Sequence, residues 1–158
     1  EIAKGQYPFA AILSCSDSRV PPEIIFDQGL GDLFVIRLAG NIVDDAVLGS
    51  LEYAVEHLGV RYIMVLGHER CGAVDATVKG GETHGHIGGL VKAIKPAFER
   101  VKDLPGDVVD NAVRANVAMV VNQLKSSSPI LEKLVNKGAL VIDGAHYNLD
   151  DGKVAVLP

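Results

Sequence analysis

The sequence predicts an α/β fold with a central, mostly parallel β-sheet: about four parallel strands plus an antiparallel C-terminal edge strand, flanked by helices. Short apolar runs alternate at least three times with segments of helical apolar spacing. This alternation is typical of a parallel sheet with right-handed crossovers and helices on both faces. The run 62–66 is apolar throughout, as expected for a central strand. With 158 residues, 48% of them hydrophobic, we expect a single domain spanning 1–158.

Three strands and two helices are predicted up to residue 66. Pro21 and Pro22 begin a short helix that continues to about residue 27, because proline is tolerated in a first helical turn. Asp44 or Asp45 caps the second helix, and Gly59 ends it. The strands are expected at 9–14, 33–38 and 62–66.

The second half is predicted to be mainly helical before it returns to the sheet. A loop rich in glycine and histidine covers 79–89, and Pro96 bends or splits the helix that follows it. Asp150, Asp151 and Gly152 form a turn, after which the last strand pairs back on the fourth. Helices are expected at 72–78, 91–101, 108–124 and 129–136, and strands at 140–143 and 154–157.

Charge and hydropathy disfavour several classes of function. The net charge is −5, and the basic residues are scattered, which disfavours nucleic-acid binding. The longest apolar run, 62–67, is too short to cross a bilayer, so no membrane partner is expected. No secretory signal is visible at the start, which favours a cytoplasmic location. The chain opens close to its first strand, so a removed upstream segment would make a periplasmic or organellar location the alternative.

Three potential metal ligands lie where predicted strands end. Cys15 follows the first strand, His68 follows the third, and Cys71 lies three residues further on. The carboxyl ends of parallel strands share one edge of the sheet, where ligands bind. Two thiolates and one imidazole suit Zn²⁺, and three protein ligands leave a fourth position open, as in catalytic zinc sites. Inert core cysteines, or a disulfide between the two, are the alternatives.

The loop after Cys15 adds a carboxylate, Asp17, and a guanidinium, Arg19. Asp17 has two alternative roles. It closes the zinc site as a fourth ligand, or Arg19 holds it in a bidentate pair so that it orients the zinc-bound nucleophile. An open position would let zinc produce hydroxide near neutral pH.

At these residues the chain resembles the β-class carbonic anhydrases. The resemblance is carried by the Cys-Ser-Asp-Ser-Arg segment at 15–19 and by the Gly-His-x-x-Cys-Gly segment at 67–72. It extends from Gln6 to about residue 154, and the helical arm that family members place before the first strand is not among these residues.

The resemblance implies Zn²⁺, one per chain, held by Cys15, His68 and Cys71, with Asp17 and Arg19 as the catalytic pair. It also implies a hydrogen bond from Gln6 to the substrate, and a homodimer or tetramer with active sites at the subunit interface. The implied lining of the narrow apolar substrate pocket is Phe34, Ala39, Tyr53 and Gly72.

Some family members also carry a second bicarbonate pocket built from Trp, Arg and Tyr. Arg37 and Tyr147 match two of its positions, but Ile12 stands at the Trp position. We therefore expect that pocket to be absent and Asp17 to stay paired with Arg19.

The function implied is reversible hydration of carbon dioxide to bicarbonate and a proton, through zinc-bound hydroxide, by a carbonate dehydratase (a zinc lyase). One alternative is a carbon disulfide or carbonyl sulfide hydrolase on the same scaffold, since such relatives keep the zinc motif. A second is a non-enzymatic, zinc-stabilised binding domain, which the presence of Asp17 and Arg19 argues against. Redox use of the cysteines lacks a Cys-x-x-Cys pair.

Overall fold

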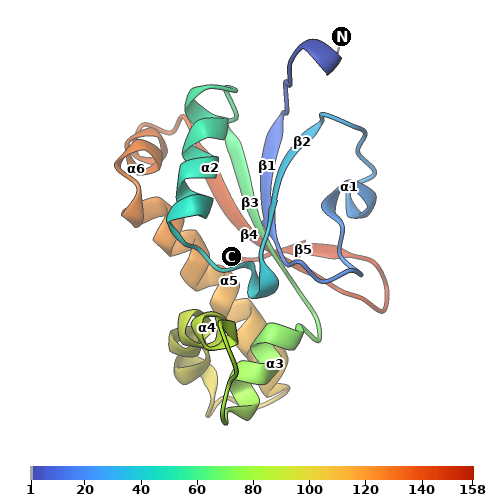
Figure 1. Cartoon of the computed structure of the whole chain (residues 1–158), viewed down its shortest axis with the longest axis vertical. Coiled ribbons are helices and arrows are strands. Elements are labelled where there is room, and N and C mark those ends of the chain that lie inside the picture. The colour runs from blue at the N-terminus through green and yellow to red at the C-terminus, as the bar shows by residue number, and fades with distance from the viewer. Residues whose placement is uncertain (1) are drawn as a thin grey trace.

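In the part of the chain that the structure describes, five strands form one sheet in the order β2-β1-β3-β4-β5 (Figure 1). The computed structural model describes residues 2–158. The first four strands pair in parallel and the fifth pairs antiparallel with the fourth, which confirms the predicted sheet. β3 lies in the centre, as its apolar sequence indicated. The strands are β1 (Ala10–Ser14), β2 (Leu33–Arg37), β3 (Tyr62–His68), β4 (Val141–Tyr147) and β5 (Val154–Val156).

Within residues 2–158, six α-helices lie between or beside these strands. The predicted N-cap is confirmed for α2, where the Asp44 carboxylate accepts a hydrogen bond from the Val47 amide. Pro96 lies inside α4 without dividing it. The helices are α1 (Pro22–Ile25), α2 (Asp45–Glu56), α3 (Gly72–Lys79), α4 (Ile87–Val101), α5 (Val108–Ser127) and α6 (Pro129–Asn136), with short 3-10 turns η1 (Ile2–Lys4) and η2 (Ala39–Asn41).

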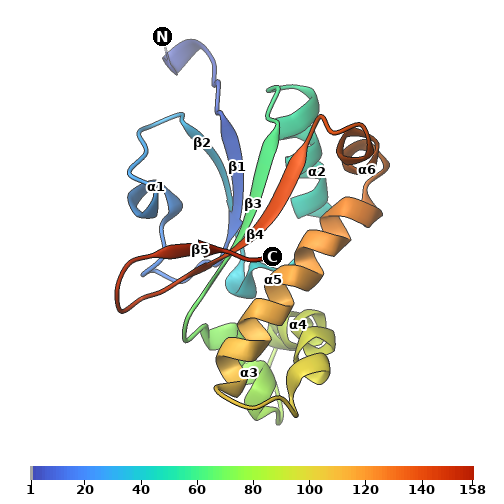
Figure 2. The same cartoon turned by 180° about the vertical axis from the view of Figure 1, so that it is seen from behind.

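The two faces of the sheet are covered unequally (Figures 1 and 2). The crossover from β1 to β2 runs in one direction along the sheet, and the next, from β2 to β3, runs back past β1. Because right-handed crossovers in opposite directions lie on opposite faces, α1 stands alone on one face, whereas α2, α5 and α6 cover the other. Helices therefore lie on both faces, as the sequence predicted, although α1 has only four residues.

The main core lies between the sheet and the helices α2, α5 and α6. Fully buried members are Leu13, Leu51, Ile63, Leu124 and Ile142. Two glycines let α5 approach the sheet closely. A Cβ atom at Gly67 would lie 2.5 Å from a Val117 methyl, and one at Gly144 would lie 2.6 Å from the other Val117 methyl. The middle of α5 therefore packs closely against β3 and β4 at these two glycines.

Five elements extend beyond their predicted bounds. β3 continues to His68, β4 to Tyr147, α3 to Lys79 and α5 to Ser127, and α4 begins at Ile87. β3 and β4 stay paired as far as His68 and Tyr147, so backbone pairing carries both strands past the point where their apolar runs stop. None of the helices within residues 2–158 is long and apolar enough to cross a membrane.

Candidate metal centre

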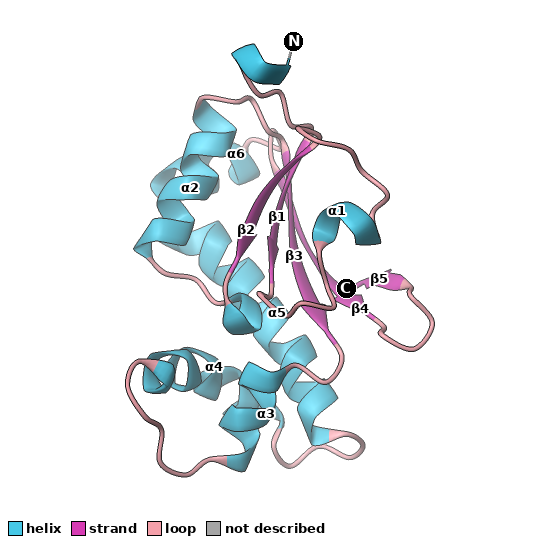
Figure 3. Ribbon diagram, turned by 45° about the vertical axis from the view of Figure 1, so that its right-hand side comes forward, coloured by secondary structure: helices cyan, strands magenta, loops and turns pink. Residues whose placement is uncertain are grey.

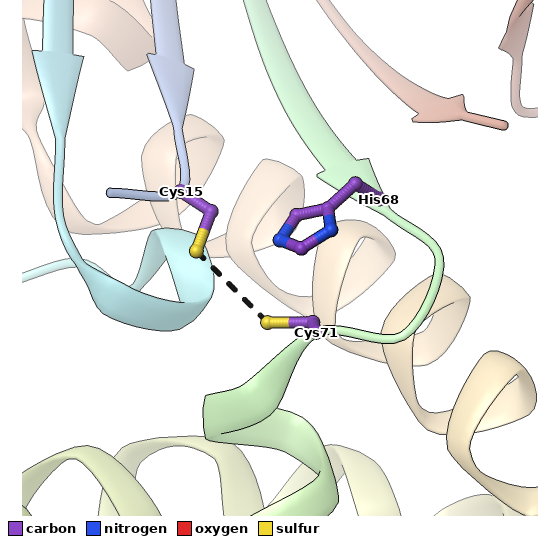
Figure 4. Close-up of side chains that lie close together, drawn as sticks. All are labelled: Cys15, His68 and Cys71. Atoms are coloured by element: carbon purple, nitrogen blue, oxygen red, sulfur yellow. Dashed lines mark hydrogen bonds between the residues drawn. The ribbon is translucent and has the colours of Figure 1, made fainter. Parts of the chain in front are cut away.

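Cys15, His68 and Cys71 meet at the carboxyl edge of the sheet (Figure 4), which is the end of the sheet nearest α3 (Figure 3). Cys15 follows β1, His68 is the last residue of β3, and Cys71 is the N-cap of α3. β1 and β3 are the neighbouring strands between which the crossovers reverse direction. Such a switch point leaves a crevice beyond the strand ends, which is where α/β sheets bind ligands. The topology thus places all three side chains where the sequence predicted.

The donor atoms of these residues form a tight, buried group. The two cysteine sulfurs lie 4.0 Å apart. One donor atom from each of the three residues can be chosen so that all lie within 4.8 Å of one another. Both cysteines are free thiols and both are buried, so the disulfide alternative is not formed here.

His68 is oriented as metal-binding histidines usually are. Its Nδ1 lies 2.8 Å from the backbone oxygen of Glu69, so Nδ1–H donates to that oxygen and the lone pair is left on Nε2. The side chain is fully buried, and Nε2 has no hydrogen-bond partner among the described residues. An orphaned, buried nitrogen that faces two sulfurs fits a metal ligand, and this donor set suits zinc.

The Cys15 sulfur is surrounded by hydrogen-bond donors. The Cys71 thiol donates to it, and so do the amides of Gly40 and Asp17, at 3.3 and 3.4 Å. These bonds, that from Cys71 above all, outweigh burial and lower the pKa of Cys15 to about 4. The same bond and burial raise the pKa of Cys71, because its proton is shared with Cys15. The thiolate form that binds metals is therefore favoured at Cys15.

Asp17 and Arg19 form the bidentate pair that the sequence predicted. Arg19 Nε and Nη2 donate to the two Asp17 carboxylate oxygens at 2.9 and 2.7 Å. The guanidinium and the Arg19 amide together hold the pKa of Asp17 well below its usual range. Asp17 Oδ2 also lies 3.8 Å from His68 Nε2, so the carboxylate borders the metal centre while Arg19 holds it.

Comparison with known proteins identifies the family. The family model described as "Carbonic anhydrase" matches residues 10–154. Carbonic anhydrase 2 of Mycobacterium tuberculosis is 42% identical, over 98% of this chain and 77% of the mycobacterial one. The tetrameric β-carbonic anhydrases of Sordaria macrospora include a structure with a TM-score of 0.92 and 27% identity, covering 99% of this chain and 83% of that one. A β-carbonic anhydrase of Coccomyxa, solved with acetazolamide, has a TM-score of 0.90 and 31% identity, covering 99% of this chain and 74% of that one.

This chain belongs to the β-carbonic anhydrase family. The resemblance noted at the two sequence motifs is thereby confirmed over most of the chain.

The substrate-binding residues expected from the β-carbonic anhydrases fall into two groups. Ala39 begins the η2 turn next to Gly40, and Gly72 begins α3 after Cys71, so both lie at the metal edge. Phe34 lies at the other end of β2, since it pairs with Ala11 whereas Arg37 pairs with Ser14.

Tyr53 and Gln6 belong with Phe34 at the amino edge. The Phe34 and Tyr53 rings have centroids 6.4 Å apart. Tyr53 and Gln6 line an open hollow of about 540 Å³ beside the N-terminal segment. Figure 1 shows that segment at the far end of the sheet from α3. Within one chain, the structure does not bring Gln6, Phe34 or Tyr53 to the metal centre.

Several residues that shape the centre were not recognised from the sequence as part of it. Arg37, noted only as a match to an accessory bicarbonate pocket, donates from β2 to the backbone oxygens of Cys15 and Asp17 at 2.8 and 2.5 Å. Arg70 has a left-handed backbone with φ of 50° between two ligands, and its carbonyl accepts from Arg19 at 3.2 Å. The available sequence signal for Gly40 was the run of short side chains at 39–41, which directly follows the strand predicted at 33–38.

Proposed function

We propose that this chain catalyses the reversible hydration of carbon dioxide to bicarbonate and a proton, with one Zn²⁺ bound by Cys15, His68 and Cys71. The observation that carries this proposal is the fully buried His68 Nε2, which has no hydrogen-bond partner among residues 2–158 and faces the two cysteine sulfurs. It occurs in a chain that belongs to the β-carbonic anhydrase family. When bound, zinc would supply a Lewis acid that makes water a usable nucleophile near neutral pH.

Asp17 orients the attacking water in this proposal. Its carboxylate is ionised across the physiological range because Arg19 depresses its pKa, so it can only accept hydrogen bonds. Arg19 occupies one side of both carboxylate oxygens, while Oδ2 remains close to His68 Nε2. A water held by Asp17 therefore points a lone pair away from the carboxylate, toward the substrate. The Arg19 pair favours this role over Asp17 as a fourth metal ligand.

The substrate side of the site is proposed to come from two chains. Carbon dioxide is small and uncharged, so it needs apolar walls, and the bicarbonate oxygen that gains negative charge needs a donor. We assign the walls to Ala39, Gly72, Phe34 and Tyr53, and the donor to Gln6. Because Gln6, Phe34 and Tyr53 lie at the opposite edge from their own metal centre, a second copy of the chain supplies them.

The exposed surface and the comparisons support this assembly. Large apolar side chains near the amino edge are exposed in the isolated chain, among them Tyr7, Phe9 and Tyr53. In a symmetric dimer, the interface buries the same patch on both copies of the chain. The Sordaria macrospora enzymes, which share this fold, are tetrameric. A homodimer, or a tetramer built from two of them, is therefore proposed.

Stopped-flow measurement of carbon dioxide hydration on protein of known zinc content tests the proposal. We expect turnover proportional to bound zinc, at about one zinc per chain. Carbon disulfide and carbonyl sulfide serve as comparison substrates, although the relatives reported above lend that alternative no support. Zinc-loaded protein that does not hydrate carbon dioxide, or that turns over a sulfur analogue faster, would contradict the proposal.

A further inference from the structure

Asn116 is an unusual residue on the buried face of α5. Its side chain is 1% exposed, and its neighbours on the same helical face, Val113, Val117 and Val120, are apolar. Its Nδ2 donates a hydrogen bond to the backbone oxygen of Gly40 at 2.8 Å. Its Oδ1 has no partner among the described residues. A buried amide left half satisfied does not favour folding, so packing alone does not account for asparagine here.

The residue that Asn116 holds is itself in contact with the metal centre. The Gly40 amide donates to the Cys15 sulfur at 3.3 Å, and the Gly40 carbonyl accepts from Asn116. One residue therefore links the helix α5 to a proposed metal ligand through its two backbone polar groups. Its φ of 72° lies in the left-handed region, which favours glycine.

Gly40 is also confined by the helices α3 and α4. A Cβ atom on Gly40 would lie 2.6 Å from Ile94 Cδ1 and 3.1 Å from Ala73 Cβ. Ile94 is fully buried, so Gly40 cannot move toward α4. With Asn116 fastening the carbonyl and Ile94 blocking displacement, the amide is held toward the sulfur.

We propose that Asn116 is a positioning residue that holds the Gly40 amide on the Cys15 thiolate and so tunes how Cys15 binds the metal. This inference rests on the metal centre proposed above. A thiolate that accepts a hydrogen bond donates less charge to its metal. Partners of this kind, one step removed from the metal, commonly set its affinity.

Asn116→Asp and Asn116→Leu test the inference, with Asn122→Leu as the matched control, because Asn122 is an exposed asparagine on the same helix. Asn116→Asp keeps the shape but replaces the donating amide by oxygen, and Asn116→Leu removes the polar atoms without adding charge. Transfer of zinc to a chelator should be roughly 10- to 100-fold faster in both Asn116 variants, because losing the support that fixes the position of Cys15 outweighs the stronger donation of its thiolate. The rate should be unchanged in the control.

The cobalt-substituted proteins give a readout that a merely structural role would not move. Loss of the hydrogen bond makes Cys15 a stronger donor, so the thiolate-to-cobalt charge-transfer band should shift to longer wavelength in the Asn116 variants only. Folded Asn116 variants with the band and zinc-release rate of the unmodified chain would overturn the inference.

A measurement on the unmodified chain applies even if the variants fail to fold. In the ¹¹³Cd-substituted protein, the Gly40 amide proton should show scalar coupling to the metal across the N–H···S bond, and a missing coupling would overturn the inference. An unmodified chain that binds no metal would refute the proposed function as well. A chain that binds metal normally, with Asn116 variants unchanged, would refute only the role of Asn116.

Discussion

The carboxyl edge of the sheet, where the parallel strands end, and the amino edge, where they begin, differ in how much of the proposed site one chain completes. At the carboxyl edge, Cys15, His68 and Cys71 are at most 4% exposed, and backbone and side-chain donors surround Cys15. At the amino edge, Tyr53 is 46% exposed and Tyr7 85% exposed. One chain builds the proposed metal half of the site, whereas the proposed substrate half is an open surface in that chain.

This difference has a physical reason. A metal centre requires donor atoms held a few ångströms apart, which short loops at neighbouring strand ends provide. A slot for carbon dioxide requires only apolar walls and one donor, and a second copy can bring these by docking. One chain therefore preorganises the donor atoms for the metal, and the assembly of two chains encloses the substrate.

Removal of a ligand should have the largest effect, because it destroys the half that one chain builds. His68→Ala leaves two sulfurs and opens a polar void, so zinc content and hydration rate should fall together, by more than the roughly 100-fold seen for residues one step from a metal. Zinc analysis and stopped-flow assays measure both. His84→Ala, in the exposed loop before α4, is the control and should change neither. Zinc retained by His68→Ala would mean that the ligand set is wrong.

Asp17→Asn should separate catalysis from metal binding at the same edge. The three donors are unchanged, so zinc content should stay near that of the unmodified chain. The rate should fall by about 10²- to 10⁴-fold, since an amide neither carries the charge nor accepts hydrogen bonds as the carboxylate does. Asp151→Asn, in the exposed β4–β5 turn, is the control. Unchanged turnover in Asp17→Asn would remove this residue from the mechanism.

Gln6→Ala probes the amino edge. The variant should keep its zinc but lose roughly 100-fold in rate, as expected when one donor to a developing oxyanion is removed. Zinc content distinguishes this loss from that of the ligand variants. A Gln6→Ala protein as active as the unmodified chain would show that Gln6 does not contact the substrate.

Mixed dimers then test whether the two edges meet between chains. The Cys15→Ala and Gln6→Ala variants are each defective alone. If each site combines the metal of one chain with Gln6 of its partner, every mixed dimer holds one intact site. Random exchange of equal amounts should then restore roughly a quarter of the activity of the unmodified protein. Subunit exchange verified by mass spectrometry with no recovered activity would contradict the shared site.

The pH dependence should show the smallest change. Because Arg19 depresses the pKa of Asp17 from its ordinary 3.8, the ion pair stabilises the fold above that ordinary value and its contribution is lost as pH falls through the lower, folded pKa. Arg19→Gln removes the cation and raises the pKa of Asp17, so the acid limb of kcat/KM should begin at higher pH. Arg100→Gln, exposed on α4, is the control. An unmoved acid limb, with zinc content verified at each pH, would show that Arg19 does not set the ionisation of Asp17.

Local sequence patterns were sufficient to predict the strands, the α-helices and the grouping of Cys15, His68 and Cys71 in a candidate metal centre. The ligands follow directly from strands whose direction is set by the α/β alternation, so their meeting at one edge could be inferred without coordinates. Asp17 and Arg19 are two residues apart, and their pairing depends on one short loop. Properties of this kind need only a few consecutive residues and the rule that parallel strands end together.

The remaining features depend on contacts between residues far apart in the chain. Only the packing of α5 on β3 and η2 shows that Asn116 holds Gly40, because 76 residues separate the two and no periodicity links them. Only the register of β1 and β2 shows that Phe34 lies away from Cys15. The sequence by itself determined which atoms are suited to bind the metal. The tertiary structure decided which backbone groups support those atoms and which residues one chain cannot bring to them, since both depend on distances that only folding establishes.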